Sequence, residues 1–136
     1  MVHHRVTEGT EEAEVGLSGT IIGAAIEVHR ALGPGLLESS YQRCLVHELR
    51  SRGVRCEEQR RVPLVYKGLT LADAYRIDLL VEGRVAVEVK ATEALQPIHQ
   101  SQLLTYLRLL DLRIGLLINF NVQTLIRGVR RIANGY

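Results

Sequence analysis

Aromatic residues and cysteines are scarce in this sequence, and each shortage narrows the class of protein. There is no tryptophan, one phenylalanine and five tyrosines, so the hydrophobic core must be mainly aliphatic. Two cysteines, Cys44 and Cys56, are too few for a disulfide scaffold, and no CxxC motif is present. We therefore expect reduced thiols and a cytoplasmic protein.

A strong net charge and long apolar runs are also absent. The formal net charge of +2 does not by itself indicate nucleic-acid binding, which would need a local basic patch. Residues 1–20 contain no apolar signal core, and runs such as Leu116–Ile118 are far too short to span a bilayer. With 136 residues, the chain is expected to form one soluble domain with one hydrophobic core.

Helical periodicity and turn residues predict three helices. Residues 1–15 are polar and without a pattern, so they are expected to form a flexible arm before a domain over residues 16–136. Ser18 is the predicted N-cap of the first helix, which ends at the turn around Pro34. The predicted helices span residues 19–32, 37–52 and 97–110.

Elsewhere the pattern changes to the two-residue period of strands. Turns are predicted at Lys67-Gly68 and around Gly83. The predicted strands span residues 54–61, 62–66, 74–81, 84–90, 114–120 and 125–132. This order of elements predicts a single α/β domain of the α+β type, with a central mixed sheet flanked by helices.

The two strands that flank Gly83 carry the most informative residues. In the second strand, burial of Val87 and Val89 on one face places Glu88 and Lys90 on the other. In the first strand, Ile77, Leu79 and Val81 are expected to share the apolar face, opposite Asp78.

The connection between these strands decides their register. A three-residue connection, Glu82–Arg84, pairs Val81 with Val85, so that both apolar faces are buried on the same side. In that register, Asp78 lies opposite Glu88, with Lys90 one step along the same face. Burial of the valines is therefore expected to bring two carboxylates and an amine together.

Such a group has a specific chemistry. Neighbouring carboxylates repel, which favours a divalent cation between them. Oxygen ligands suit Mg²⁺ or Mn²⁺, with the Val89 carbonyl as a further ligand. A bound cation polarises a phosphodiester, and Lys90 would orient the attacking water or balance the charge. The spacing D-x9-E-x-K alone is also typical of an ordinary exposed strand with alternating charges.

A GxxExxY motif at Gly35–Tyr41 is followed by further motifs in a fixed order. These are Tyr75–Val81, Val87–Ala91, His99–Leu107, Gly115–Phe120 and Arg130–Ile132. Over residues 18–134 the chain resembles the GxxExxY protein family of the PD-(D/E)XK nuclease superfamily. The resemblance implies the restriction-endonuclease-like sheet, metal binding by Asp78 and Glu88, and a catalytic Lys90. Ile77 stands where the superfamily has a dispensable proline.

The resemblance also gives Glu38 a function. Glu38 looks like the helix carboxylate that reaches the metal or its water, although a carboxylate also favours any helix N-terminus. Tyr41, three residues later, is either a substrate contact or part of the core, and we favour the core.

The helix after Lys90 supplies the remaining candidates. His99, Gln102 and Tyr106 follow one stripe of this helix. Gln102 resembles the superfamily's glutamine that hydrogen-bonds the substrate or a metal-bound water. Tyr106 is a further substrate contact, and His99 is either a substrate contact or a surface residue.

Two functions of different classes are consistent with these features. The first is a Mg²⁺- or Mn²⁺-dependent nuclease acting on nucleic acid, with DNA favoured over RNA. The alternative is a non-catalytic module that binds nucleic acid or protein on the same fold. Scattered arginines are expected to be mostly solvated rather than a phosphate-binding surface. A homodimer through an exposed edge strand or the Leu116–Phe120 segment is a further hypothesis.

Overall fold

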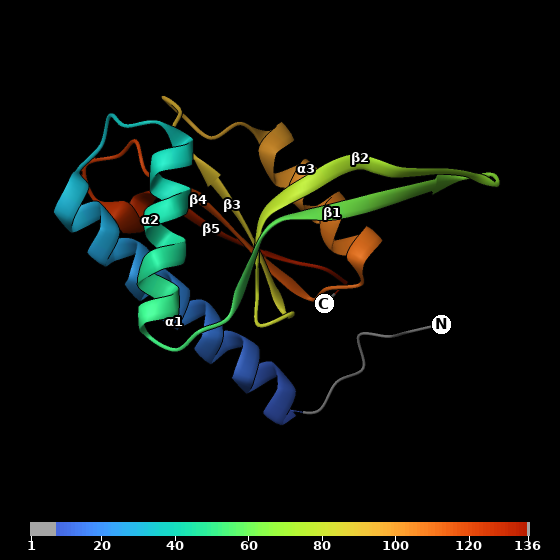
Figure 1. The fold of residues 1–136 in the computed structure, drawn as a ribbon, viewed down its shortest axis with the longest axis horizontal. Helices are drawn as coiled ribbons and strands as arrows, with labels where there is room; N and C mark the ends of the chain where they lie inside the picture. Colours follow the sequence, from blue (N-terminus) through green and yellow to red (C-terminus); the bar gives the residue numbers. More distant parts are fainter. Residues whose placement is uncertain (1–7, 136) are drawn as a thin grey trace.

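A five-stranded mixed sheet, in the order β1-β2-β3-β4-β5, carries helices on both of its faces (Figure 1). The computed structural model describes the backbone of residues 8–135 and the side chains of residues 12–135. The elements are α1 (Glu8–Leu32), α2 (Glu38–Ser51), β1 (Cys56–Tyr66), β2 (Leu69–Val81), β3 (Val85–Lys90), α3 (Pro97–Leu110), β4 (Ile114–Asn119), the 3₁₀ helix η1 (Leu125–Gly128) and β5 (Val129–Ala133). No helix in the described residues is long and apolar enough to cross a membrane.

One connection in the sheet is parallel and the others are antiparallel. β3 and β4 run parallel, with Val85 beside Ile114 and Lys90 beside Asn119, and α3 makes the crossover between them. β1–β2, β2–β3 and β4–β5 are antiparallel pairs. The predicted class, one small α+β domain with a mixed sheet flanked by helices, is confirmed.

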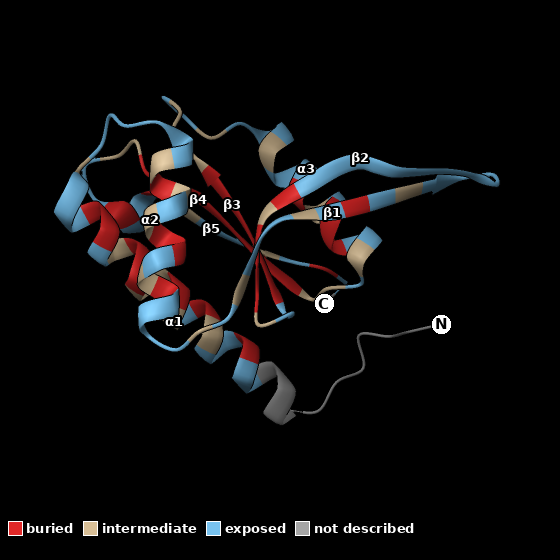
Figure 2. Ribbon diagram, in the orientation of Figure 1, coloured by how far each residue is buried: buried red, intermediate tan, exposed pale blue. Residues whose placement is uncertain are grey.

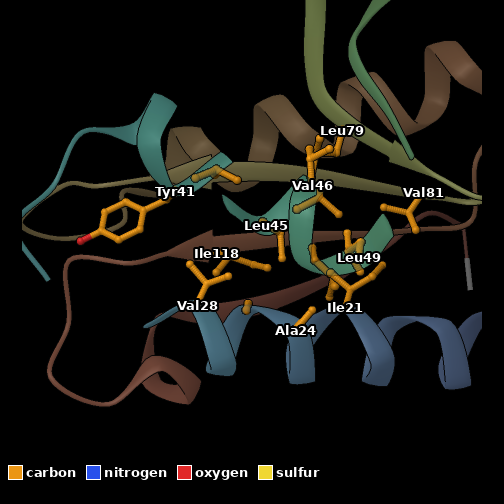
Figure 3. Close-up of a cluster of buried hydrophobic side chains, with 14 of the residues drawn as sticks. Ile21, Ala24, Val28, Tyr41, Leu45, Val46, Leu49, Leu79, Val81 and Ile118 are labelled. Carbon is orange, nitrogen blue, oxygen red and sulfur yellow. The ribbon is translucent and has the colours of Figure 1, made fainter. Parts of the chain in front are cut away.

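The core lies in two layers, one on each face of the sheet. Under α1 and α2, residues such as Ile21, Leu45 and Val81 are completely buried, and we call this layer the α1–α2 core (Figure 3). Under α3, residues such as Leu103 and Leu117 form the α3 core. Buried positions therefore line the middle of the sheet on both sides (Figure 2).

The first helix is longer than the sequence pattern predicts. α1 begins at Glu8, so the prediction of a flexible arm is wrong for residues 8–15, and residues 1–7 lie outside the described residues. Ser18 is not an N-cap but a buried residue inside α1, where its hydroxyl donates to Val15 O and accepts from Arg131. The hydrogen bond from the distant Arg131 ties this part of α1 to the C-terminal strand.

β1 and β2 form one long hairpin that projects beyond the rest of the sheet (Figure 1). The two short strands predicted over residues 54–66 are one strand, and β2 begins at Leu69 rather than Ala74. The turn predicted at Lys67-Gly68 is present. Most of the projecting part is exposed (Figure 2), which explains why it lacks a clear apolar alternation.

The C-terminal strands differ from the prediction in two respects. Residues Leu125–Gly128 form η1, so β5 begins only at Val129. All residues of β4 are buried, because β4 lies between β3 and β5 and is covered on both faces. Leu116–Phe120 is therefore not available as a dimer surface.

Candidate functional site

The hairpin between β2 and β3 has the predicted register. Val81 pairs with Val85, Leu80 with Ala86 and Leu79 with Val87. Glu82 and Gly83 both have positive φ values, 52° and 66°, and the Arg84 N–H donates to Val81 O to close the turn. Gly83 therefore supplies one of the positive φ values of this turn, as expected for a three-residue connection.

Beyond the Leu79–Val87 pair, β2 and β3 are joined by hydrogen bonds from backbone N–H groups to side-chain carboxylates. The Asp78 N–H donates to Glu88 Oε2 over 3.2 Å, and the Val89 N–H donates to Asp78 Oδ2 over 2.8 Å. The two carboxylates that were expected to face each other are thus held together at the end of the hairpin ladder. We call Asp78 and Glu88 the carboxylate pair.

β2 changes face at Asp78. Leu79 and Val81 pack in the α1–α2 core, whereas Ile77 packs in the α3 core on the opposite side of the sheet. In a regular strand these three residues would share a face, so the expectation that Ile77 joins Leu79 is wrong. Because the strand changes face between Ile77 and Leu79, Asp78 lies at an irregular point of β2.

Gln59 occupies the matching position on β1. The β1–β2 pairing includes Glu58–Leu79 and Arg60–Ile77 but omits Gln59 and Asp78 between them. Gln59 has φ = 51°, and its side-chain amide donates to Asp78 Oδ1 at 3.2 Å and to Gln42 Oε1 at 3.1 Å. A glutamine in an exposed strand gives no sequence signal for this contact, and the residue was missed for that reason.

The carboxylate pair is electrostatically unusual. Glu88 is only 7% exposed. Burial, followed by its hydrogen bond and charge contact with Asp78, raises the pKa of Glu88 to about 9, and the nearby Lys90 ammonium opposes this shift. The direction of this shift favours a proton on Glu88 that a cation could replace, because ionising a buried carboxylate beside a second carboxylate is costly.

An open cavity of about 550 Å³ adjoins Asp78 on the side of α2. Its lining includes Leu37, Glu38, Gln42, Gln59, Asp78 and Ala91. Glu38 is exposed in the first turn of α2, and it lines the same cavity as Asp78. Within the described part of the chain, no three histidine, cysteine, aspartate or glutamate side chains form a group that could hold a metal ion.

On the other side, α3 brings Gln102 and Tyr106 towards the carboxylate pair. Tyr106 is buried, and burial and the Glu88 carboxylate raise its pKa, while a hydrogen bond from Gln102 opposes the shift. Tyr106 also contacts the ring of Tyr75, with 5.8 Å between the centroids. Of the α3 stripe predicted from the sequence, Tyr106 therefore borders the site, with Gln102 beside it.

Two of the predicted substrate contacts, Tyr41 and His99, have structural roles. Tyr41 is completely buried, stacks on Phe120 with 4.6 Å between the centroids, and hydrogen-bonds the backbone of Gly33 and Leu36. Its complete burial agrees with the preferred interpretation of Tyr41 as a core residue. His99 Nδ1 accepts the Gln96 N–H and thereby caps α3, a bond that the helical spacing could not reveal.

Most of the arginines considered from the sequence have protein partners. Those that form ion pairs do so with acidic residues nearby: Arg52 with Glu48, Arg55 with Glu82, Arg60 with Glu57 and Arg61 with Asp73. Arg130 donates to backbone carbonyls and Arg131 to Ser18. These contacts agree with the expectation of a solvated face rather than a phosphate-binding surface.

A mixed sheet with two carboxylates and a lysine at the end of a central hairpin is the arrangement that the sequence resemblance implies for a domain of the nuclease class. Comparison with family models gives the same class, because the model of the PD-(D/E)XK nuclease superfamily matches residues 16–132. The chain belongs to the PD-(D/E)XK nuclease superfamily. No curated protein and no solved structure matches it significantly.

Proposed function

We propose that this protein is a Mg²⁺- or Mn²⁺-dependent nuclease of the GxxExxY type that hydrolyses phosphodiester bonds, with DNA favoured over RNA. The observation that carries the proposal is the carboxylate pair, which the chain holds together at the end of the β2–β3 ladder. Lys90 follows Glu88 on β3 and is close enough for its charge to act on that carboxylate. Membership of the nuclease superfamily supports the reaction class.

The donor set fits a hard divalent cation. Asp78 and Glu88 would be its carboxylate ligands, the Val89 carbonyl a further ligand, and Glu38 would bind it directly or through water across the shared cavity. Mg²⁺ is often bound by only one or two carboxylates, with water and substrate phosphate completing the shell. The proton retained by Glu88 supports the fit, because it marks a place where positive charge is favoured.

Lys90, Gln102 and Tyr106 would supply the remaining catalytic and positioning roles. When bound, the cation neutralises phosphate charge and lowers the pKa of a water ligand. The Lys90 ammonium would orient the attacking water and balance negative charge that develops on the phosphate. Gln102 would donate a hydrogen bond to the substrate or to that water from α3, and Tyr106 would support Gln102 through their hydrogen bond.

The test is cleavage of labelled single- and double-stranded DNA and RNA with Mg²⁺ or Mn²⁺. Wild type is compared with Asp78→Ala and Lys90→Ala, and circular dichroism checks that each variant is folded. Metal-dependent cutting that both substitutions abolish supports the nuclease. No cutting, together with no Asp78-dependent Mn²⁺ binding by calorimetry, would leave a non-catalytic binding module as the better account.

A further inference from the structure

A second cavity lies between α3 and the base of the β1–β2 hairpin. It has a volume of about 310 Å³, and we call it the α3–hairpin pocket. Its lining includes Leu64, Tyr75, Ile98, Gln102, Tyr106 and Leu109. The α3 members recur at helical spacing, so one stripe of the helix faces the hairpin across this space. None of the roles proposed above for the carboxylate pair requires such a pocket.

The pocket exposes apolar and aromatic surface that the fold leaves uncovered. Ile98 is 68% exposed and Tyr75 is 43% exposed, although both lie beside a buried core. One part of the Tyr75 ring contacts Tyr106, which leaves the rest of it accessible. Ser101 and Gln102 add polar groups to the same lining. A flat aromatic ring with aliphatic walls and an amide at the edge suits a planar heterocycle.

The pocket lies near the carboxylate pair, and this position indicates which planar heterocycle would bind there. Tyr75 precedes Asp78 by three residues on β2, a separation of about 10 Å along a strand. Tyr106 lines the pocket and also lies close enough to Glu88 and Asp78 for their charges to act on it, and Gln102 lines the pocket beside Tyr106. A phosphodiester held at the carboxylate pair would therefore place its attached nucleoside beside the pocket.

We propose that the α3–hairpin pocket binds an unpaired nucleobase next to the scissile phosphate, with Tyr75 as its stacking surface. The inference rests on the proposed nuclease activity and deepens it, because it selects single-stranded or locally unpaired nucleic acid as the substrate. A base inside a duplex is stacked and paired, so it would have to leave the helix before entering. Stacking on an aromatic ring tolerates any base, so the pocket confers little sequence preference.

The test compares a single-stranded oligonucleotide with the same strand made abasic at the nucleotides flanking the mapped cleavage position. Wild type is expected to prefer the intact strand, and Tyr75→Ala should lower this intact-to-abasic ratio of kcat/KM about tenfold. Tyr75→Phe, which keeps the ring, should retain the ratio. Tyr66→Ala is the matched control, because Tyr66 is 61% exposed on the same hairpin but outside the pocket.

Binding is measured separately from cleavage. 2-Aminopurine, moved along the strand one position at a time, should be quenched at one position when Lys90→Ala protein binds the strand, and adding Tyr75→Ala should remove the quenching. An intact-to-abasic ratio or a quenching signal that does not depend on Tyr75 overturns the proposal. Quenching that depends on Tyr75 while wild type cuts nothing supports the pocket and sinks only the nuclease. If Tyr75→Ala abolishes self-association in sedimentation and leaves the ratio unchanged, a second copy covers this face and the proposal is wrong.

Discussion

The side-chain amide of Gln59 donates to Asp78 Oδ1 over 3.2 Å, where the β1–β2 ladder omits both residues. Gln59 has φ = 51°, in the left-handed region that residues other than glycine rarely adopt. Asp78 is the point at which β2 changes face. An uncommon backbone conformation persists when the surrounding structure holds it, and here it directs an amide at a carboxylate of the proposed site.

Replacing Gln59 with glycine distinguishes the role of its backbone conformation from the role of its side-chain amide. Glycine tolerates a φ of 51°, so the free energy of unfolding should stay within about 1 kcal/mol of wild type. The variant loses the amide that orients Asp78, so its Mn²⁺ affinity should fall about 10-fold, as for other partners that orient metal ligands. Urea unfolding and calorimetry measure the two quantities.

Gln42→Ala is the control for this effect. Gln42 accepts from Gln59 over 3.1 Å but makes no contact with Asp78 among the hydrogen bonds of the described residues, so its loss should weaken Mn²⁺ binding less. Equal Mn²⁺ affinities for Gln59→Gly and wild type would show that Gln59 does not position Asp78.

The convergence of Asp78 and Glu88 could be predicted from the sequence, because it follows from burial of the apolar residues of β2 and β3. Only one register between β2 and β3 buries the apolar residues of both strands together, and that register brings Asp78 to Glu88. Gly83 supported it, because the connection needs a residue with positive φ. The convergence of the carboxylates could therefore be predicted without any tertiary information.

The remainder depends on contacts between distant parts of the chain. The face change at Asp78 needs Gln59, which is 19 residues away in sequence, and an exposed glutamine has no pattern that reveals such a partner. The N-terminal part of α1 is likewise fixed by distant residues, because Glu14 forms an ion pair with Arg113. Local periodicity carries no information about either contact, and the predicted flexible arm failed for this reason.

Tyr41→Phe tests the structural role of the GxxExxY tyrosine. The substitution keeps the stacking on Phe120 but removes the hydroxyl that bonds Gly33 O and Leu36 N. We expect the free energy of unfolding to fall by about 1 kcal/mol, because two backbone groups lose a hydrogen bond at a partly buried site. Urea unfolding measures the change. A loss of DNA affinity in a variant of unchanged stability would instead make Tyr41 a substrate contact.

The pH dependence of stability tests the proton held by the carboxylate pair. The folded pKa of Glu88 is about 9, above the 4.5 of an ordinary glutamate, so the folded chain binds more protons between these values. Without metal, the contribution of Glu88 to stability is therefore full below pH 4.5 and is lost as the pH rises towards 9. Glu88→Gln cannot titrate and should lack this slope.

The measurement is urea unfolding of both proteins in EDTA at pH 5 and pH 8. The stability of Glu88→Gln relative to wild type should increase by roughly 1–3 kcal/mol between these two pH values. Excess Mn²⁺ should reduce the difference, because the cation takes the place of the proton in wild type. Parallel pH profiles for the two proteins would show that Glu88 is ionised throughout.

Lys90→Ala separates catalysis from metal binding. Lys90 is not among the proposed metal ligands, so the variant should bind Mn²⁺ about as tightly as wild type, whereas Asp78→Ala should not. Its kcat for a labelled strand should fall at least about 100-fold, since one preorganised positive group at the reacting phosphate is lost. Lys90→Arg keeps the charge but changes its shape and reach, so it should restore only part of the activity. Cleavage by Lys90→Ala at the wild-type rate, with Mn²⁺ bound, would remove Lys90 from the mechanism and restrict the catalytic groups to the carboxylate pair and its cation.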